Sequence, residues 1–161
     1  MILTVSIWYF VGLLAIASLF YLIRFRPKAS IKYEFDEALL SPDEREFKNL
    51  LNGYRQSVGL SYLRTDKKAG FVAYEHCIKM VNEQRVYHNK EDGRYDGLIG
   101  GSHFNEIVNG EFYNVLSCFR GFMESEDHFK VINGKEHNTV GLSVERDGDN
   151  KVYATVIFFR I

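Results

Sequence analysis

The sequence predicts an α+β domain that follows a single membrane-spanning helix. Three observations predict this class. Residues 2–23 form an apolar run without a charged side chain. Helical patterns, with apolar side chains three and four residues apart, fill the middle of the chain. Residues 139–160 contain two apolar, strand-like segments around a polar turn, which is typical of a β-hairpin.

Length and composition limit the possible classes of protein. A chain of 161 residues is long enough for one compact domain with an appendage. The formal net charge is −1, so no concentrated basic face is expected and nucleic acid is not a predicted partner. The two cysteines, Cys77 and Cys118, each lie in an apolar helical pattern. We therefore expect two buried thiols rather than a disulfide framework.

The N-terminal run has the length of a transmembrane helix. Residues 2–23 would extend about 33 Å as a helix, enough to cross a hydrocarbon core of roughly 30 Å. A cleaved signal peptide would begin with a basic residue, and residues 1–4 contain neither Lys nor Arg. We therefore predict a single-pass protein of the cell membrane, with a transmembrane helix at 1–25, a tether at 26–40 and a folded domain at 41–161.

Capping signals mark the first two helices of the domain. Ser41 is followed by Pro42 and by Glu44, so both partners of a capping box are present and a helix should begin here. Gly59 is a suitable end for it. Thr65-Asp66 should cap a second helix, in which alanines, Cys77, Met80 and Val81 repeat on one face.

The second half of the chain predicts a third helix and three strands. Residues 104–108 should form a short strand, and residues 111–126 a helix with a broad apolar face. The strands at 139–145 and 151–160, joined by a polar turn, should close the domain as a hairpin.

An ordered set of residues spread along the chain resembles a known family. Its members are Asn52, Arg55, Ala73, Met80, His88, Glu106, Phe122, Ser125 and His128. The set is similar to the CAP superfamily (cysteine-rich secretory protein, antigen 5, pathogenesis-related 1; SCP-like) in its small, disulfide-free bacterial form. It covers about three quarters of the chain. Phe122 stands where the family usually has Trp, and residues 104–106 replace its Gly-Glu segment. The resemblance implies an α-β-α sandwich with a small antiparallel sheet between helices.

The resemblance also implies a site. His88 and His128 should face each other across an open cleft with Glu106 beside them, and Ser125 and Glu124 should lie at the same cleft. Asn52 and Arg55 should tie the first helix to neighbouring loops. His76 lies next to the apolar stripe of its helix, so we interpret it as a core or boundary histidine with one satisfied nitrogen rather than as a ligand.

Three functions from different classes fit these residues. The first is a membrane-anchored binding or interaction module, whose cleft or surface recognises a lipid, a glycan or a protein. The second is a structural subunit of a larger membrane protein complex. The third is a metal-dependent hydrolase that uses His88, Glu106 and His128, in which the two imidazoles and the carboxylate could hold zinc with an open coordination position. Ser125 lacks a nucleophile elbow and neither cysteine has an activating environment, so no catalytic residue is assigned and an enzyme is not the favoured hypothesis.

The side of the membrane is predicted differently by two signals. Arg24, Arg26 and Lys28 directly follow the apolar run, and the positive-inside rule then places the C-terminal domain in the cytoplasm. The family resemblance implies an extracytoplasmic domain, which is the side we adopt as our hypothesis.

Overall fold

The computed structural model describes residues 39–89, 97 and 99–161. The predicted transmembrane helix at 1–25 lies outside these residues, as does the tether at 26–40 except for its last two residues. Within the described part of the chain, none of the helices combines the length and the apolar character needed to cross a membrane.

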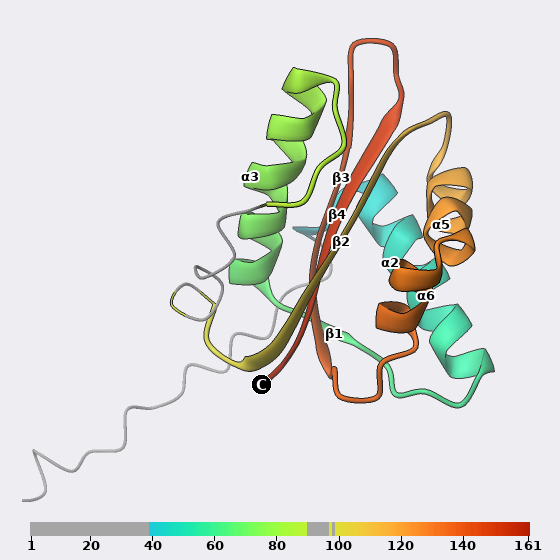
Figure 1. Ribbon diagram of the computed structural model, residues 1–161, viewed down its shortest axis with the longest axis vertical. Coiled ribbons are helices and arrows are strands. Elements are labelled where there is room, and N and C mark those ends of the chain that lie inside the picture. The colour runs from blue at the N-terminus through green and yellow to red at the C-terminus, as the bar shows by residue number, and fades with distance from the viewer. Residues whose placement is uncertain (1–38, 90–96, 98) are drawn as a thin grey trace, which may run out of the picture. The chain divides into compact units, whose positions relative to one another are not determined.

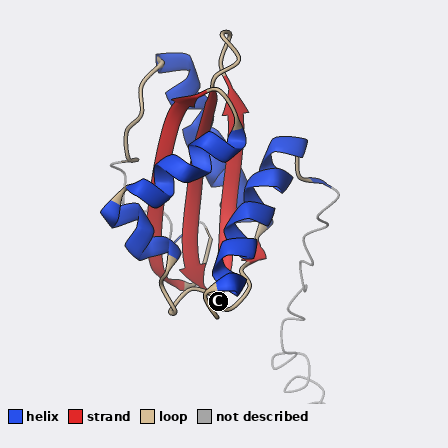
Figure 2. Ribbon diagram, turned by 90° about the vertical axis from the view of Figure 1, so that its right-hand side faces the viewer, coloured by secondary structure: helices blue, strands red, loops and turns tan. Residues whose placement is uncertain are grey.

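In the described part of the chain, four helices cover the two faces of one four-stranded sheet (Figure 1). In chain order, the elements are α2 (Pro42–Ser57), β1 (Arg64–Thr65), α3 (Lys67–Glu83), β2 (Ser102–Phe112), α5 (Val115–Glu124), α6 (Glu126–Ile132), β3 (Thr139–Arg146) and β4 (Val152–Arg160). Helix α3 lies on one face of the sheet, and α2, α5 and α6 lie on the other, where Figure 2 shows helices crossing in front of the strands. The three-layer arrangement confirms the predicted α+β fold class.

The sheet is mixed, which corrects the prediction of a purely antiparallel sheet. The strand order is β1-β3-β4-β2, and the β3–β4 and β4–β2 pairs are antiparallel, as a hairpin and its neighbour should be. Strand β1 runs parallel to the first two residues of β3. Because β1 is only two residues long and leads directly into α3, it has no alternating pattern by which the sequence could reveal it.

The predicted caps of the first two helices are confirmed. The Ser41 hydroxyl accepts from the Glu44 amide at 3.2 Å, and the Glu44 carboxylate accepts from the Ser41 amide at 2.8 Å. The Asp66 carboxylate accepts from the Ala69 amide at 2.9 Å. These bonds satisfy amides at the helix starts that have no partner within the helix.

The prediction of a continuous third helix at 111–126 is wrong at both ends. Strand β2 continues to Phe112, which pairs with Val152, so the helix begins only after Asn114. The Asn114 side chain accepts from the Ser117 amide at 2.8 Å and fixes that start. The backbone turns extended again at Ser125, which separates α5 from α6 and places His128 within α6.

Apolar side chains fill both interfaces between helices and sheet. The larger core, between the sheet and α2, α5 and α6, includes Phe47, which meets the rings of Phe119 and Phe122 edge-on. On the other face α3 packs so closely on β3 that a Cβ added at Gly141 would overlap Ala69. Cys77 and Cys118 are buried and unpaired, as predicted, and burial raises the pKa of each thiol to about 12.

Two polar side chains of α2 join this helix to neighbouring loops. Asn52 donates to the Leu63 carbonyl at 3.2 Å and accepts from the Leu63 amide at 2.8 Å. The fully buried Arg55 donates to the carbonyls of Ser61, Ile132 and Gly134 at 3.0, 2.6 and 3.0 Å. The guanidinium therefore connects the loop before β1 to the loop after α6.

Replacing Arg55 should destabilise the fold strongly. Arg55→Met removes the charged donor and leaves three carbonyls without it, so we expect the free energy of unfolding to fall by about 3 kcal/mol. Urea denaturation of the purified domain measures this loss. The matched control is Arg120→Met, because Arg120 is exposed on α5 and should cost less than about 0.5 kcal/mol. Equal losses in the two variants would show that the Arg55 network contributes little.

His137, in the loop before β3, is a buried histidine outside the predicted cleft. Its side chain is 0% exposed, and its Nε2 accepts from Asn105 Nδ2 at 3.0 Å. Burial lowers the pKa of His137, and the positive charge of Arg55 acts in the same direction, while Glu136 opposes it. The buried ring is therefore held in its neutral form.

The domain should lose stability in mild acid through His137. A histidine whose folded pKa is lowered binds its proton more readily when unfolded, so its contribution is complete above the ordinary pKa of about 6.5 and is lost as the pH falls below it. His137→Gln keeps an acceptor for Asn105 but cannot take up a proton. Urea midpoints between about pH 7.5 and 5 should therefore fall less in the variant than in the wild type. Parallel curves would contradict this account of His137.

Candidate functional site

Glu106 lies at the centre of the predicted site. It sits in β2, where it pairs with Ile157 of β4. Its neighbour Ile107 points into the core beneath α2 and α5, so strand alternation directs Glu106 toward the face that α3 covers. The Glu106 side chain is 7% exposed. A carboxylate this deeply buried needs hydrogen-bond donors around it.

Among the described residues, three groups bond to the Glu106 carboxylate. Oε2 lies 3.1 Å from Nδ1 of His76, and Oε1 lies 3.2 Å from Nδ1 of His88. The amide of Asn89 also donates to Oε1, at 3.0 Å. One carboxylate therefore joins β2, α3 and the segment that follows α3.

The second imidazole of the predicted cleft comes from the other helical layer. The rings of His128, in α6, and His88 have centroids 6.2 Å apart and meet at 60°. Phe122 also packs against His128, with ring centroids 5.2 Å apart. Burial lowers the pKa of His128, the charge of His88 lowers it further, and Asp127 opposes both. Nδ1 of His128 is buried, and no hydrogen-bond partner for it exists among the described residues.

The structure thus brings together three of the five residues predicted for the cleft. His88, Glu106 and His128 form one cluster. Ser125 is the boundary residue between α5 and α6, and its side chain does not cap α6. Glu124 is exposed at the end of α5. Within the described part of the chain, no hydrogen bond joins Ser125 or Glu124 to the cluster.

His76 belongs to the cluster, which the sequence analysis did not predict. Its interpretation as a core histidine with one satisfied nitrogen fits its 2% exposure, but the group that satisfies the nitrogen is Glu106. His76 lies three residues after Ala73 and four before Met80, on the buried face of α3. A histidine on the buried face of a helix requires a polar partner. The position of His76 in the apolar stripe was therefore a signal in the sequence that such a partner exists.

The cluster offers a metal two imidazoles and no complete ligand set. Both Glu106 oxygens are engaged by donors. The described residues contain no group of three or more His, Cys, Asp or Glu placed to hold a metal ion. A structural zinc site takes four protein ligands and a catalytic one usually three. His88 and His128 alone would leave most of the coordination sphere to other ligands.

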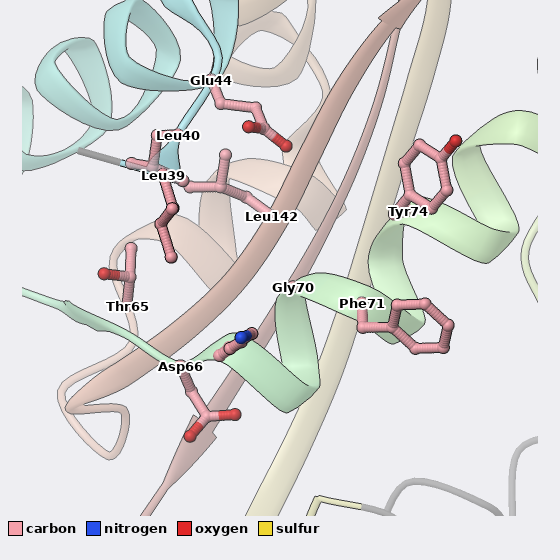
Figure 3. Close-up of a pocket in the computed structure, with 10 residues that line it drawn as sticks. Leu39, Leu40, Glu44, Thr65, Asp66, Gly70, Phe71, Tyr74 and Leu142 are labelled. Carbon is pink, nitrogen blue, oxygen red and sulfur yellow. The ribbon is translucent and has the colours of Figure 1, made fainter. Parts of the chain in front are cut away.

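A separate, mainly apolar hollow lies between the start of α2, helix α3 and strand β3 (Figure 3). Its volume is roughly 240 Å³. Leu39 and Leu40 form one side, Phe71 and Tyr74 of α3 form the other, and Leu142 of β3 lies between them. None of the five residues predicted for the cleft lines this hollow, so the two features are distinct.

Solved structures with the same fold come from several organisms. An outer surface protein of Borrelia burgdorferi superposes with a TM-score of 0.66 at 17% identity, covering 73% of this chain and 92% of that one. An extracellular protein with an SCP domain from Bacillus anthracis gives 0.64 at 20% identity, with 76% and 44% covered. At these identities, the likeness shows the fold alone. No curated protein sequence matches the chain.

One more solved structure bears on metal binding. A protein named NaASP2, crystallised with Zn²⁺, superposes with a TM-score of 0.54 at 13% identity, covering 76% of this chain and 82% of that one. The zinc is a property of that crystal.

A family model settles the relationship that the ordered residues indicated. It is described as the cysteine-rich secretory protein family, CAP, and it matches residues 48–158. The match spans more than half of the chain and includes His88, Glu106 and His128. With its two cysteines unpaired, the chain belongs to the CAP family as a disulfide-free member.

Proposed function

We propose that this protein is a membrane-anchored CAP-domain binding module that captures a hydroxyl-rich ligand, of the glycan class, between His88 and His128. The observation that supports this most directly is that the centroids of the two rings lie 6.2 Å apart, although the rings belong to different helical layers. His88 is 57% exposed, so a ligand can reach it from solvent.

The chemistry of the two rings favours a ligand that donates hydrogen bonds. His88 directs Nδ1 to Glu106, which leaves Nε2 on the opposite side of its ring. If Nδ1 carries the proton, Nε2 is an acceptor. Nδ1 of His128 is buried without a partner among the described residues, so a ligand would contact this ring through Nε2. Lipid tails would instead suit the apolar hollow, which lies elsewhere.

Replacing both imidazoles should abolish capture without unfolding the domain. The variant His88→Ala with His128→Ala removes two hydrogen bonds to the ligand, so binding to a retained oligosaccharide on a glycan array should weaken by at least about tenfold. Circular dichroism and a urea midpoint near the wild-type value would show that the fold is intact.

His103→Ala is the matched control for this experiment. His103 is an exposed histidine on β2, outside the cluster, and its variant should bind as the wild type does. A wild-type protein that retains no oligosaccharide, or a double variant that binds normally, would refute the proposed site.

Zinc capture by the same pair is the second candidate. It is favoured by two neighbouring imidazoles and by the zinc in the NaASP2 crystal. Bound there, zinc would supply a Lewis acid, as a metal-dependent hydrolase requires. Isothermal titration with Zn²⁺ tests it: uptake at micromolar concentration that is lost in His88→Ala would support this candidate, and no uptake would exclude it.

Membrane anchoring by residues 1–25 is part of the proposal. It rests on the uncharged run at 2–23, which is long enough to cross a bilayer. We propose that the domain faces the outside of the cell, in keeping with the outer-surface and extracellular proteins that share its fold. Arg24, Arg26 and Lys28 argue for the opposite side, so orientation needs a direct measurement.

Cysteine labelling of intact cells gives that measurement. Gly148 lies in the exposed β3–β4 turn, and a Cβ there meets no other atom within 4 Å, so Gly148→Cys should fold normally. A membrane-impermeant maleimide should label this variant from outside. The wild type is the control, because Cys77 and Cys118 are buried and should not react. Labelling only after lysis would place the domain in the cytoplasm.

A further inference from the structure

His76 occupies an unusual position for a histidine that is not itself at the cleft. It is 2% exposed and contacts Glu106 through Nδ1, while its Nε2 is buried without a hydrogen-bond partner among the described residues. The ring of Tyr87 meets it edge-on, with centroids 5.3 Å apart. Packing thus fixes the ring on one side and the carboxylate fixes it on the other.

The surroundings of His76 select one tautomer. With the proton on Nδ1, the ring donates to Oε2 of Glu106. With the proton on Nε2, a buried N–H would have no acceptor within the described part of the chain, and the lone pair of Nδ1 would face a carboxylate oxygen. Each of these is unfavourable in a buried site. His76 therefore acts as a donor that cannot reverse its role.

Because Nδ1 of His76 donates to Oε2, the other oxygen of Glu106, Oε1, is the one left for the residues after α3. Oε2 is committed to α3, so Oε1 is the oxygen that accepts from His88 and from the Asn89 amide. An acceptor at this position draws the proton of His88 to Nδ1. The other nitrogen, Nε2, then presents a lone pair on the exposed side of the ring.

We infer that His76 is a positioning residue: it orients Glu106 so that His88 is held as its Nδ1–H tautomer, with Nε2 as the acceptor at the cleft. The ligand does not touch His76. The consequence for ligand binding rests on the proposed function, whereas the tautomer of His88 is a property of the protein without ligand. An experiment can therefore contradict the proposed ligand binding without contradicting the tautomer of His88, and the reverse.

The tautomer can be read directly by NMR. Long-range ¹H–¹⁵N spectra of the ¹⁵N-labelled full chain in detergent micelles, at about pH 8 where histidines are neutral, distinguish a protonated from an unprotonated ring nitrogen. In the wild type, we expect His88 to show a pyrrole-type Nδ1 and a pyridine-type Nε2. In His76→Phe, the ring volume is kept and the donor is lost, so the two His88 shifts should move toward each other as both tautomers become populated.

Two further variants separate positioning from packing. In His76→Asn, the amide nitrogen can take the place of Nδ1, so the wild-type His88 shifts should return. Tyr87→Phe keeps the ring against His76 and removes only the hydroxyl that bonds to Glu83, so His88 should not change. A wild-type His88 protonated on Nε2 would overturn the inference, as would a folded His76→Phe variant with unaltered shifts. Failure of the glycan experiment would leave these spectra unaffected.

Discussion

The buried carboxylate of Glu106 is the constraint on which the candidate site depends. An ionised side chain that is 7% exposed is costly unless donors surround it, and here the donors come from His76, His88 and the Asn89 amide. These donors belong to α3 and to the segment after it. The need to satisfy one charge on β2 therefore fixes the position of α3 along the sheet and brings His88 to the place where it meets His128.

A buried positive charge organises the opposite helical layer in a comparable way. Arg55 of α2 donates to carbonyls in the loop before β1 and in the loop after α6. Carbonyl groups in loops lack the regular partners that helices and strands supply, so a guanidinium with several donors can satisfy a group of them. On each face of the sheet a buried charged residue thus joins segments distant in sequence. Arg55 also secures the loop that leads into the small β1 strand.

The sequence predicted those features that arise from local patterns. Ser41 with Glu44 and Asp66 with Ala69 form the expected caps, because capping bonds link residues three positions apart. The hairpin alternation and the buried thiols were likewise evident. The parallel β1 strand was not evident, because two residues are too few to show an alternating pattern. The break between α5 and α6 at Ser125 was not evident either, because the apolar pattern continues through it. The sequence also did not reveal the partner of His76. Glu106 lies 30 residues away, and only the packing of α3 on β2 brings the two residues together.

The two imidazoles that bond to Glu106 differ in exposure, and this difference determines how a contact at His88 is connected to the core. His76 is 2% exposed and His88 is 57% exposed, although both bind the same carboxylate. One oxygen thus bonds to a buried ring and the other to an exposed one. A ligand that bound His88 would contact a ring that is hydrogen-bonded to Glu106 of β2, whose other oxygen bonds to His76 of α3. Because such a ligand would bind the folded protein, it would stabilise this native contact by mass action. The connection from His88 to α3 thus runs through the two oxygens of one carboxylate on β2.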